Sequence, residues 1–232
     1  MCFRGNNMKI KRVLTALCCL FAALFLVTGI VDLTAKDKLY SALFKTVNYG
    51  YPIHGGHETE LKKGDYVLCG TYDGEQLLWR VVSENGEVLQ SEYIVDFAPF
   101  GKSSDWEKSD LKKELEKSVD GVVGDVSVLS KDELSKLSAG ERKKQPTASA
   151  AMNCKTRFLF LRKNCWYWTS SGVSTNSLSV AAVTQSGTFY KSPATDELMG
   201  VCPALRLESN SVTVVVGNGS KETPYVIGGE ME

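Results

Sequence analysis

The longest apolar run of the chain covers Val13–Val31 and contains no charged residue. As a helix that rises about 1.5 Å per residue, it is roughly 28 Å long, close to the hydrocarbon core of a bilayer at about 30 Å. Four basic residues and no acidic one precede it, namely Arg4, Lys9, Lys11 and Arg12. The pattern predicts a cytoplasmic basic N-terminus over 1–12, a transmembrane helix or signal sequence over 13–31, and extracytoplasmic residues after it.

The apolar run has two interpretations, which differ at its end. A cleaved signal peptide usually has an apolar region of about 7 to 15 residues followed by a small-x-small site. This run is longer, and the candidate site Leu33-Thr34-Ala35 places a bulky leucine where a small residue is needed. The sequence therefore favours an uncleaved anchor of a single-pass cell-membrane protein, and secretion after cleavage is the alternative.

Polar residues interrupted by glycines and Pro52 predict a juxtamembrane stalk over 32–63, followed by a folded domain over 64–216. The domain opens with a three-stranded antiparallel meander over 66–91. Its two hairpin turns are Asp73-Gly74 and Asn85-Gly86, because these pairs supply the positive φ angles of type I′ turns.

Two short helices are predicted after the meander, at 109–118 and 130–138, each with a capping residue. Strands return between 165 and 216, and 217–232 is predicted to be a C-terminal tail. Strands, then helices, then strands again is an α+β order with an antiparallel sheet, not a βαβ alternation.

Four cysteines lie in the predicted exported part, namely Cys69, Cys154, Cys165 and Cys202. In an oxidising compartment they permit one or two disulfides, whose pairing the spacing leaves open. No two of them form a C-x-x-C motif, which disfavours zinc-ribbon and thioredoxin-type sites.

The charge of the chain disfavours nucleic acid as a ligand. Four of its 27 basic residues lie in the cytoplasmic tip, against 27 acidic residues overall, so the exported part carries a net charge of about −4. His54 and His57, the two histidines, are too few for most hydrolase schemes and are expected to lie in a solvated linker. No regular calcium loop is present either, and neither metal nor cofactor is predicted.

The tryptophans and two loops are the candidates for binding. Trp166 and Trp168 lie on one side of a predicted strand, where they can form a carbohydrate or peptide platform, although core packing is the favoured interpretation. Ser, Thr and Asn are frequent in the loops 173–178 and 191–200, which suits adaptable polar contacts. The candidate binding residues are therefore Trp166, Trp168, Asn176 and Tyr190.

An ordered set of short motifs carries a family resemblance. These include Gly64-Asp65-Tyr66-Val67-Leu68, Leu78-Trp79-Arg80-Val81-Val82, Trp166-Tyr167-Trp168 and Pro203-Ala204-Leu205-Arg206-Leu207. Together they resemble domain-of-unknown-function family 6273, an exported bacterial module, over about residues 64–207. The resemblance implies a C-type-lectin-like fold displayed at the bacterial cell surface. Cys202 replaces the arginine usual in that family, which suggests a Cys165–Cys202 disulfide, with Cys154–Cys165 as the alternative.

The function that these features imply is a membrane-tethered extracytoplasmic binding or interaction module without enzymatic activity. Its ligand is expected to be a glycan or an envelope protein. One alternative is a structural subunit of a cell-envelope assembly. Another is a cell-envelope enzyme of the sulfatase-modifying-factor type, which requires a reactive cysteine pair such as Cys165 and Cys202.

Overall fold

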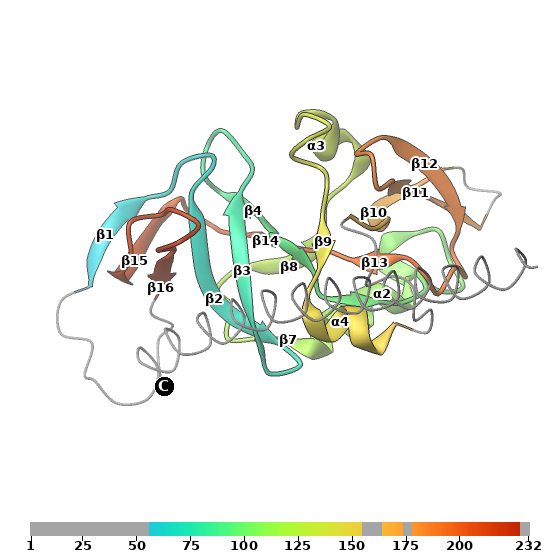
Figure 1. Ribbon diagram of the computed structural model, residues 1–232, viewed down its shortest axis with the longest axis horizontal. Helices are drawn as coiled ribbons and strands as arrows, with labels where there is room; N and C mark the ends of the chain where they lie inside the picture. Colours follow the sequence, from blue (N-terminus) through green and yellow to red (C-terminus); the bar gives the residue numbers. More distant parts are fainter. Residues whose placement is uncertain (1–55, 155–163, 174–177, 228–232) are drawn as a thin grey trace, which may run out of the picture. The chain divides into compact units, whose positions relative to one another are not determined.

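The computed structural model describes residues 56–154, 164–173 and 178–227. The segments predicted over 1–12 and 13–31, most of the stalk, His54 and Asn176 lie outside the described residues. Within the described ranges, no helix has the length and apolar character needed to cross a bilayer. This part of the chain is α+β and consists mostly of sheet with a few short helices (Figure 1).

A nine-stranded sheet forms the larger part of the fold. In spatial order its strands are β1 (His57–Glu60), β15 (Ser211–Val216), β16 (Tyr225–Ile227), β2 (Tyr66–Tyr72), β3 (Glu75–Val81), β4 (Val88–Ser91), β14 (Pro203–Arg206) and β8 (Asp125–Val128), with β7 (Val119–Asp120) paired to β2 outside this path. Neighbouring strands are antiparallel, except that β16 runs parallel to β2. β1 and β8 are therefore the two ends of the path.

A five-stranded sheet forms the second layer of strands. Its order is β12 (Phe189–Pro193), β11 (Ser179–Val183), β10 (Tyr167–Gly172), β13 (Gly200–Val201) and β6 (Asp96–Phe97), and a separate pair joins β5 (Tyr93–Ile94) to β9 (Gln145–Pro146). The chain passes from β13 in this sheet to β14 in the larger one at Cys202. One short stretch thus connects the two sheets.

The predicted meander is confirmed as β2, β3 and β4, and Trp79 in its centre pairs with both Val67 and Ser91. Asp73 and Gly74 both have positive φ, as the tight turn requires. The second connection differs from the prediction, because only Gly86 has positive φ there and the chain runs as a longer loop. A Cβ at Gly86 would lie 2.2 Å from the carbonyl oxygen of Leu61, so the close approach requires glycine.

The two predicted helices are present, and one is shorter than expected. α2 (Asp110–Ser118) begins where the Ser109 hydroxyl accepts a hydrogen bond from the Lys112 N–H. α3 (Lys131–Ser135) has the predicted capping box between Ser130 and Glu133 but ends before residue 138. A 3₁₀ turn, η1 (Trp106–Lys108), and a third helix, α4 (Ala148–Asn153), were not predicted.

Both boundary segments of the predicted domain belong to the larger sheet. Strand β1 lies within the predicted stalk and pairs with β15, so the sheet begins at His57 and not at Gly64. Strand β16 lies within the predicted tail and sits between β15 and β2. Val226 in its centre is buried with Leu68 and Leu78, which explains why three residues suffice for an interior strand.

Strand β10 separates two hydrophobic clusters. Trp168 packs with Trp79 in the larger cluster, whereas Tyr167 packs with Cys165 and Cys202 in the smaller one. Successive side chains of a strand point to opposite faces, so adjacent residues reach different clusters. Both tryptophans also satisfy their indole N–H, Trp79 at the carbonyl of Cys69 (2.9 Å) and Trp168 at that of Ala98 (2.8 Å).

Candidate functional site

The structure separates the residues that the sequence suggested for binding. Trp168 is fully buried, so its ring belongs to the core and offers no face to a ligand. Trp166 is half-buried and meets the exposed Tyr190 edge to face, with ring centroids 5.4 Å apart. Asn176 lies outside the described residues. Of the four candidates, only Trp166 and Tyr190 form a pair near the surface.

The expected Cys165–Cys202 disulfide is wrong in this structure, because the described residues contain no disulfide. Both cysteines are buried in the smaller cluster. In the parallel pairing of β10 with β13, Tyr167 faces Gly200. Cys165 precedes β10 by two residues and Cys202 directly follows β13, so the pairing of these strands does not place the two cysteines opposite each other.

The Cys202 thiol instead donates a hydrogen bond to the carbonyl of Ser91 at 3.4 Å. Burial raises the pKa of Cys202 to about 12, although nearby Lys144 opposes this shift. Burial likewise raises the pKa of Cys69 to about 12. Both thiols are therefore protonated at neutral pH, which removes the thiolate that nucleophilic chemistry needs.

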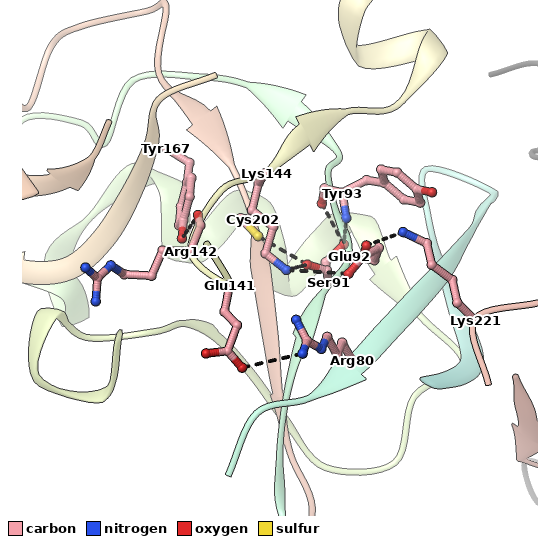
Figure 2. Close-up of polar contacts among 10 residues, drawn as sticks. All are labelled: Arg80, Ser91, Glu92, Tyr93, Glu141, Arg142, Lys144, Tyr167, Cys202 and Lys221. Atoms are coloured by element: carbon pink, nitrogen blue, oxygen red, sulfur yellow. Dashed lines mark hydrogen bonds and ion pairs between the residues drawn. The ribbon is translucent and has the colours of Figure 1, made fainter. Parts of the chain in front are cut away.

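The carbonyl of Ser91 also contacts a set of charged side chains that we call the Glu92 cluster, formed by the buried Lys144 and the partly exposed Glu92 and Lys221 (Figure 2). The Lys144 side chain is only 3 % exposed; its Nζ donates to the Ser91 carbonyl at 2.8 Å and lies 3.9 Å from Glu92 Oε2. Lys221 pairs with the other oxygen of Glu92.

The Glu92 cluster joins three parts of the chain that are distant in sequence. Glu92 directly follows β4, Lys144 directly precedes β9, and Lys221 lies in the segment before β16. The Lys221 ammonium also lies over two aromatic rings, 5.3 Å from the ring centroid of Tyr93 and 5.7 Å from that of Tyr66. The cluster therefore attaches the C-terminal segment to the meander.

Further polar contacts fix the segment between α3 and β9 to the sheet. Glu141 pairs with Arg80 of β3 at 3.4 Å, and the backbone carbonyl of Arg142 accepts the Tyr167 hydroxyl at 2.8 Å (Figure 2). Both contacts are made within the protein, so they have a structural role beside the Glu92 cluster. No group of three or more His, Cys, Asp and Glu in the described ranges is arranged to hold a metal ion.

A groove with a volume of about 640 Å³ lies between α2 and β8, and we call it the β8 groove. One wall is α2, with Lys112, Leu115 and Glu116, and the opposite wall is the continuous run 124–128. The half-buried ring of Trp106 from η1 lines it as well. Trp106 is held in place by the buried ring of Phe100, 6.0 Å away between centroids.

The two cations of the β8 groove have carboxylate partners in the protein. Lys112 pairs with Glu107 and with Glu116, and Arg206 pairs with Glu133 at 2.6 Å. Burial alone would raise the pKa of Glu133, but hydrogen bonds from Ser130 and the contact with Arg206 outweigh it, so that pKa is lowered. The Glu133 carboxylate therefore stays charged and holds Arg206 at the groove.

Ser127 lines the β8 groove, but its hydroxyl oxygen is buried from solvent and forms no hydrogen bond with any described residue. This hydroxyl is therefore not among the polar groups that the groove presents to a ligand.

The sequence indicates Trp106 as one of four tryptophans that can form a platform and as part of the family motif Trp106-Glu107-Lys108-Ser109-Asp110-Leu111, and Arg206 as part of the Pro-Ala-Leu-Arg-Leu motif. The sequence predicts a short apolar strand over 125–129, which the structure shows as β8 (Asp125–Val128), but no local signal indicates that it ends a sheet beside a helix. Neither a family model, a curated protein sequence nor a solved structure matches the chain. Of the two features described here, the β8 groove can receive a ligand, whereas the Glu92 cluster holds segments of the fold together.

Proposed function

We propose that this chain is a non-enzymatic binding module, tethered at the extracytoplasmic face of the cell membrane by residues 13–31, and that its ligand occupies the β8 groove. The observation that carries the proposal is a groove of about 640 Å³ whose walls come from a helix and from the last strand of a sheet. Ligand sites commonly measure about 300–1,000 Å³ and combine an apolar lining with a few polar groups.

The lining of the β8 groove contains apolar side chains, although more of its accessible surface is polar than apolar. Leu115, Val119, Val122 and Val126 supply apolar surface, and Trp106 adds an aromatic ring. Aromatic rings of this kind anchor both peptides and sugars because they contribute large contact areas with little loss of side-chain entropy. An envelope protein or a glycan is accordingly the class of ligand that we propose.

The buried thiols favour binding over catalysis. The enzyme alternative rests on a reactive cysteine pair, whereas Cys202 is buried and its pKa is raised to about 12. The C-type-lectin-like relationship implied by the sequence resemblance remains part of the proposal, and the α+β arrangement with short helices is compatible with it.

A second function, as a structural subunit of a cell-envelope assembly, is favoured by exposed apolar side chains at the end of the five-stranded sheet. Leu178 is 57 % exposed and Tyr190 58 % exposed, and Val173 and Leu198 are exposed as well. Contiguous apolar patches commonly mark a protein–protein contact, so this second function requires that these side chains form one patch.

The test uses the full-length protein in detergent micelles, presented to glycan and peptide arrays. Trp106→Ala removes the aromatic ring that lines the groove, and Tyr190→Ala is the matched aromatic control outside the groove. We expect ligand binding that Trp106→Ala abolishes and Tyr190→Ala retains, with circular dichroism confirming that both variants fold. Loss of ligand binding in Tyr190→Ala alone would place the binding site at the exposed apolar side chains around Tyr190. Absence of any binding that depends on Trp106 would contradict the proposal.

A further inference from the structure

The outer side of β8 is closed by neighbouring elements, since both α2 and β10 pack against it. Val128 at the end of β8 is 1 % exposed, and the Ser170 N–H of β10 donates to the carbonyl of Leu129, which follows β8. The backbone of this strand is therefore not open to an added strand. A ligand in the β8 groove has to be recognised by the side chains that line the groove.

The apolar side chains of the β8 groove are less exposed than its carboxylates. We call its one buried and three half-buried apolar residues the floor, namely Leu115, Val119, Val122 and Val126. We call its three exposed carboxylates the rim, namely Glu107, Glu116 and Asp125. Lysine and arginine side chains combine an apolar stem with a charged end, so they fit this order of floor and rim.

Carboxylates outnumber cations at the β8 groove. Lys112 pairs with two carboxylates of the rim, and Arg206 pairs with Glu133 beside the groove. With Glu133 included, four carboxylates thus accompany two cations. This excess of negative charge disfavours an anionic ligand and favours a cationic one by charge complementarity.

Asp125 supplies the carboxylate that a cationic ligand can use most readily. It lies opposite Arg206 in the pairing of β8 with β14, but Arg206 pairs with Glu133 at 2.6 Å. Within the part of the chain that the structure describes, the Asp125 carboxylate forms no ion pair. A cation that enters the groove can therefore bind Asp125 without displacing a cation of the protein.

The half-buried ring of Trp106 favours arginine over other cations. A guanidinium binds the face of a tryptophan ring within about 6 Å of its centroid, because the negative face of the ring attracts the cation. The planar guanidinium also pairs with a carboxylate through two parallel hydrogen bonds, which the compact lysine ammonium does not do. A neutral glycan would also pack on this ring, but it would leave the excess of carboxylates uncompensated.

We infer that the β8 groove binds an arginine side chain of a basic envelope protein. Its aliphatic stem packs against the floor, its guanidinium binds among the carboxylates of the rim, and Trp106 contributes an aromatic surface. This inference rests on the proposed binding function and narrows its ligand class to a basic protein segment. A second copy of the chain is disfavoured as the partner, because the exported part carries a net charge of about −4.

The test uses a blocked heptapeptide of alternating glycine and arginine, titrated into the full-length protein in detergent micelles. One matched peptide carries citrulline, which has the shape of arginine without its charge. The other carries a shorter arginine homologue whose side chain has one methylene group in place of three. We expect the citrulline peptide to bind at least about tenfold more weakly and the short-stem peptide about threefold to tenfold more weakly.

The two matched peptides test separate parts of the inference. Equal affinity of the arginine and citrulline peptides would show that charge is not recognised. Equal affinity of the arginine and short-stem peptides would show attraction by the rim alone, without a stem on the floor. Either result would overturn the inference.

Variants and methyl resonances locate the arginine peptide on the protein. Asp125→Asn should weaken its binding about threefold to tenfold, whereas Glu58→Gln, which removes an exposed carboxylate at the opposite end of the sheet, should change it by less than about twofold. In the unsubstituted protein, saturating peptide should shift the methyl resonances of Val126 and leave those of Val214 on β15 unchanged. Equal losses in the two variants, or equal shifts of the two valines, would overturn the inference.

A chitin tetrasaccharide separates this inference from the proposed function. If the tetrasaccharide binds in a Trp106-dependent manner and the arginine peptide does not, the proposed function stands and the inference fails. If neither these probes nor any ligand of the arrays binds in a Trp106-dependent manner, both fail. A dimer that forms without peptide and blocks peptide binding would make a second copy of the chain the occupant and overturn the inference.

Discussion

The Glu92 cluster gathers two cations around one carboxylate, whereas each cation of the β8 groove has carboxylates of its own, and water reaches the carboxylates of the two regions to different degrees. The Glu92 side chain is 16 % exposed, whereas those of Glu107 and Glu116 are 68 % and 56 % exposed. A buried charge without its partner costs several kcal/mol because it has lost its hydration, whereas an exposed charge is readily solvated.

The difference separates charges that the fold requires from charges that a ligand can use. The Glu92 cluster connects segments that follow β4, precede β9 and precede β16, so its loss affects the attachment of the C-terminal segment. The groove charges of α2, η1 and β8 lie at the surface, and only the Arg206–Glu133 pair joins segments that are distant in sequence, β14 and α3. Substitutions in the Glu92 cluster should therefore reduce stability, whereas substitutions of the exposed groove charges should reduce binding and leave stability nearly unchanged.

The largest effect on stability is expected from Glu92→Ala. The substitution leaves the buried Lys144 ammonium without its carboxylate, and breaking such a pair costs about 3–5 kcal/mol of unfolding free energy. Urea denaturation followed by circular dichroism measures this loss. Glu84→Ala, which removes the exposed partner of Lys63, is the control and should leave the midpoint nearly unchanged. Equal midpoints for both variants would show that the Glu92 cluster is not required for stability.

A smaller effect is expected from Lys221→Met, because Lys221 is half-exposed and solvent screens its pair with Glu92. Methionine retains an apolar stem over Tyr66 and Tyr93 and removes only the charge. We expect a loss of about 1 kcal/mol. Hydrogen exchange should accelerate in Tyr225–Ile227 before it does in β3, because Lys221 fastens the segment that leads into β16. Uniform acceleration in both strands would argue against this local role.

How far the sequence predicts the fold depends on how local each signal is. Asp73-Gly74 specifies a tight turn through the φ angles of two adjacent residues, and the Ser130–Glu133 capping box lies within one helical turn. Both predictions are confirmed. Strand β16 depends instead on Val226 fitting between its two neighbours in the sheet. One of these neighbours, β2, lies more than 150 residues earlier in the chain. Three residues carry no periodic pattern that reveals such a partner.

The candidate site was harder to predict for the same reason. Trp106, Arg206 and the run 124–128 are separated in the sequence, and their convergence depends on β8 being the last strand of the sheet. The predicted cysteine pairing is wrong because it rested on the expected oxidising compartment and on the replacement of a family arginine by Cys202. Neither observation gives the register of the strands. Cys165 and Cys202 share a cluster, yet the parallel pairing of β10 with β13 does not place them opposite each other.

Acid should weaken the groove wall through Glu133. Because hydrogen bonds lower its pKa in the folded state below the ordinary value, its contribution to stability is complete above about pH 5 and is lost as the pH falls through the folded-state pKa. Glu133→Gln retains a hydrogen-bond acceptor and cannot titrate. We expect this variant to be about 1 kcal/mol less stable at pH 7 and to lose less stability than the wild type between pH 5 and about pH 3. Parallel pH profiles of the two proteins would contradict the assignment.

The smallest effect on stability is expected when the rim of the β8 groove is neutralised by Glu116→Gln together with Asp125→Asn. Both side chains are exposed and water replaces the lost interactions, so the urea midpoint should not change measurably. Affinity for a basic ligand identified on the peptide array should fall about threefold to tenfold, and its decrease with added salt should become shallower, because fewer charges are screened. Glu84→Gln removes one exposed carboxylate outside the groove and should leave both quantities unchanged. A rim variant that loses stability as Glu92→Ala does would show that the groove charges also hold the fold together, and the distinction between the two regions would be lost.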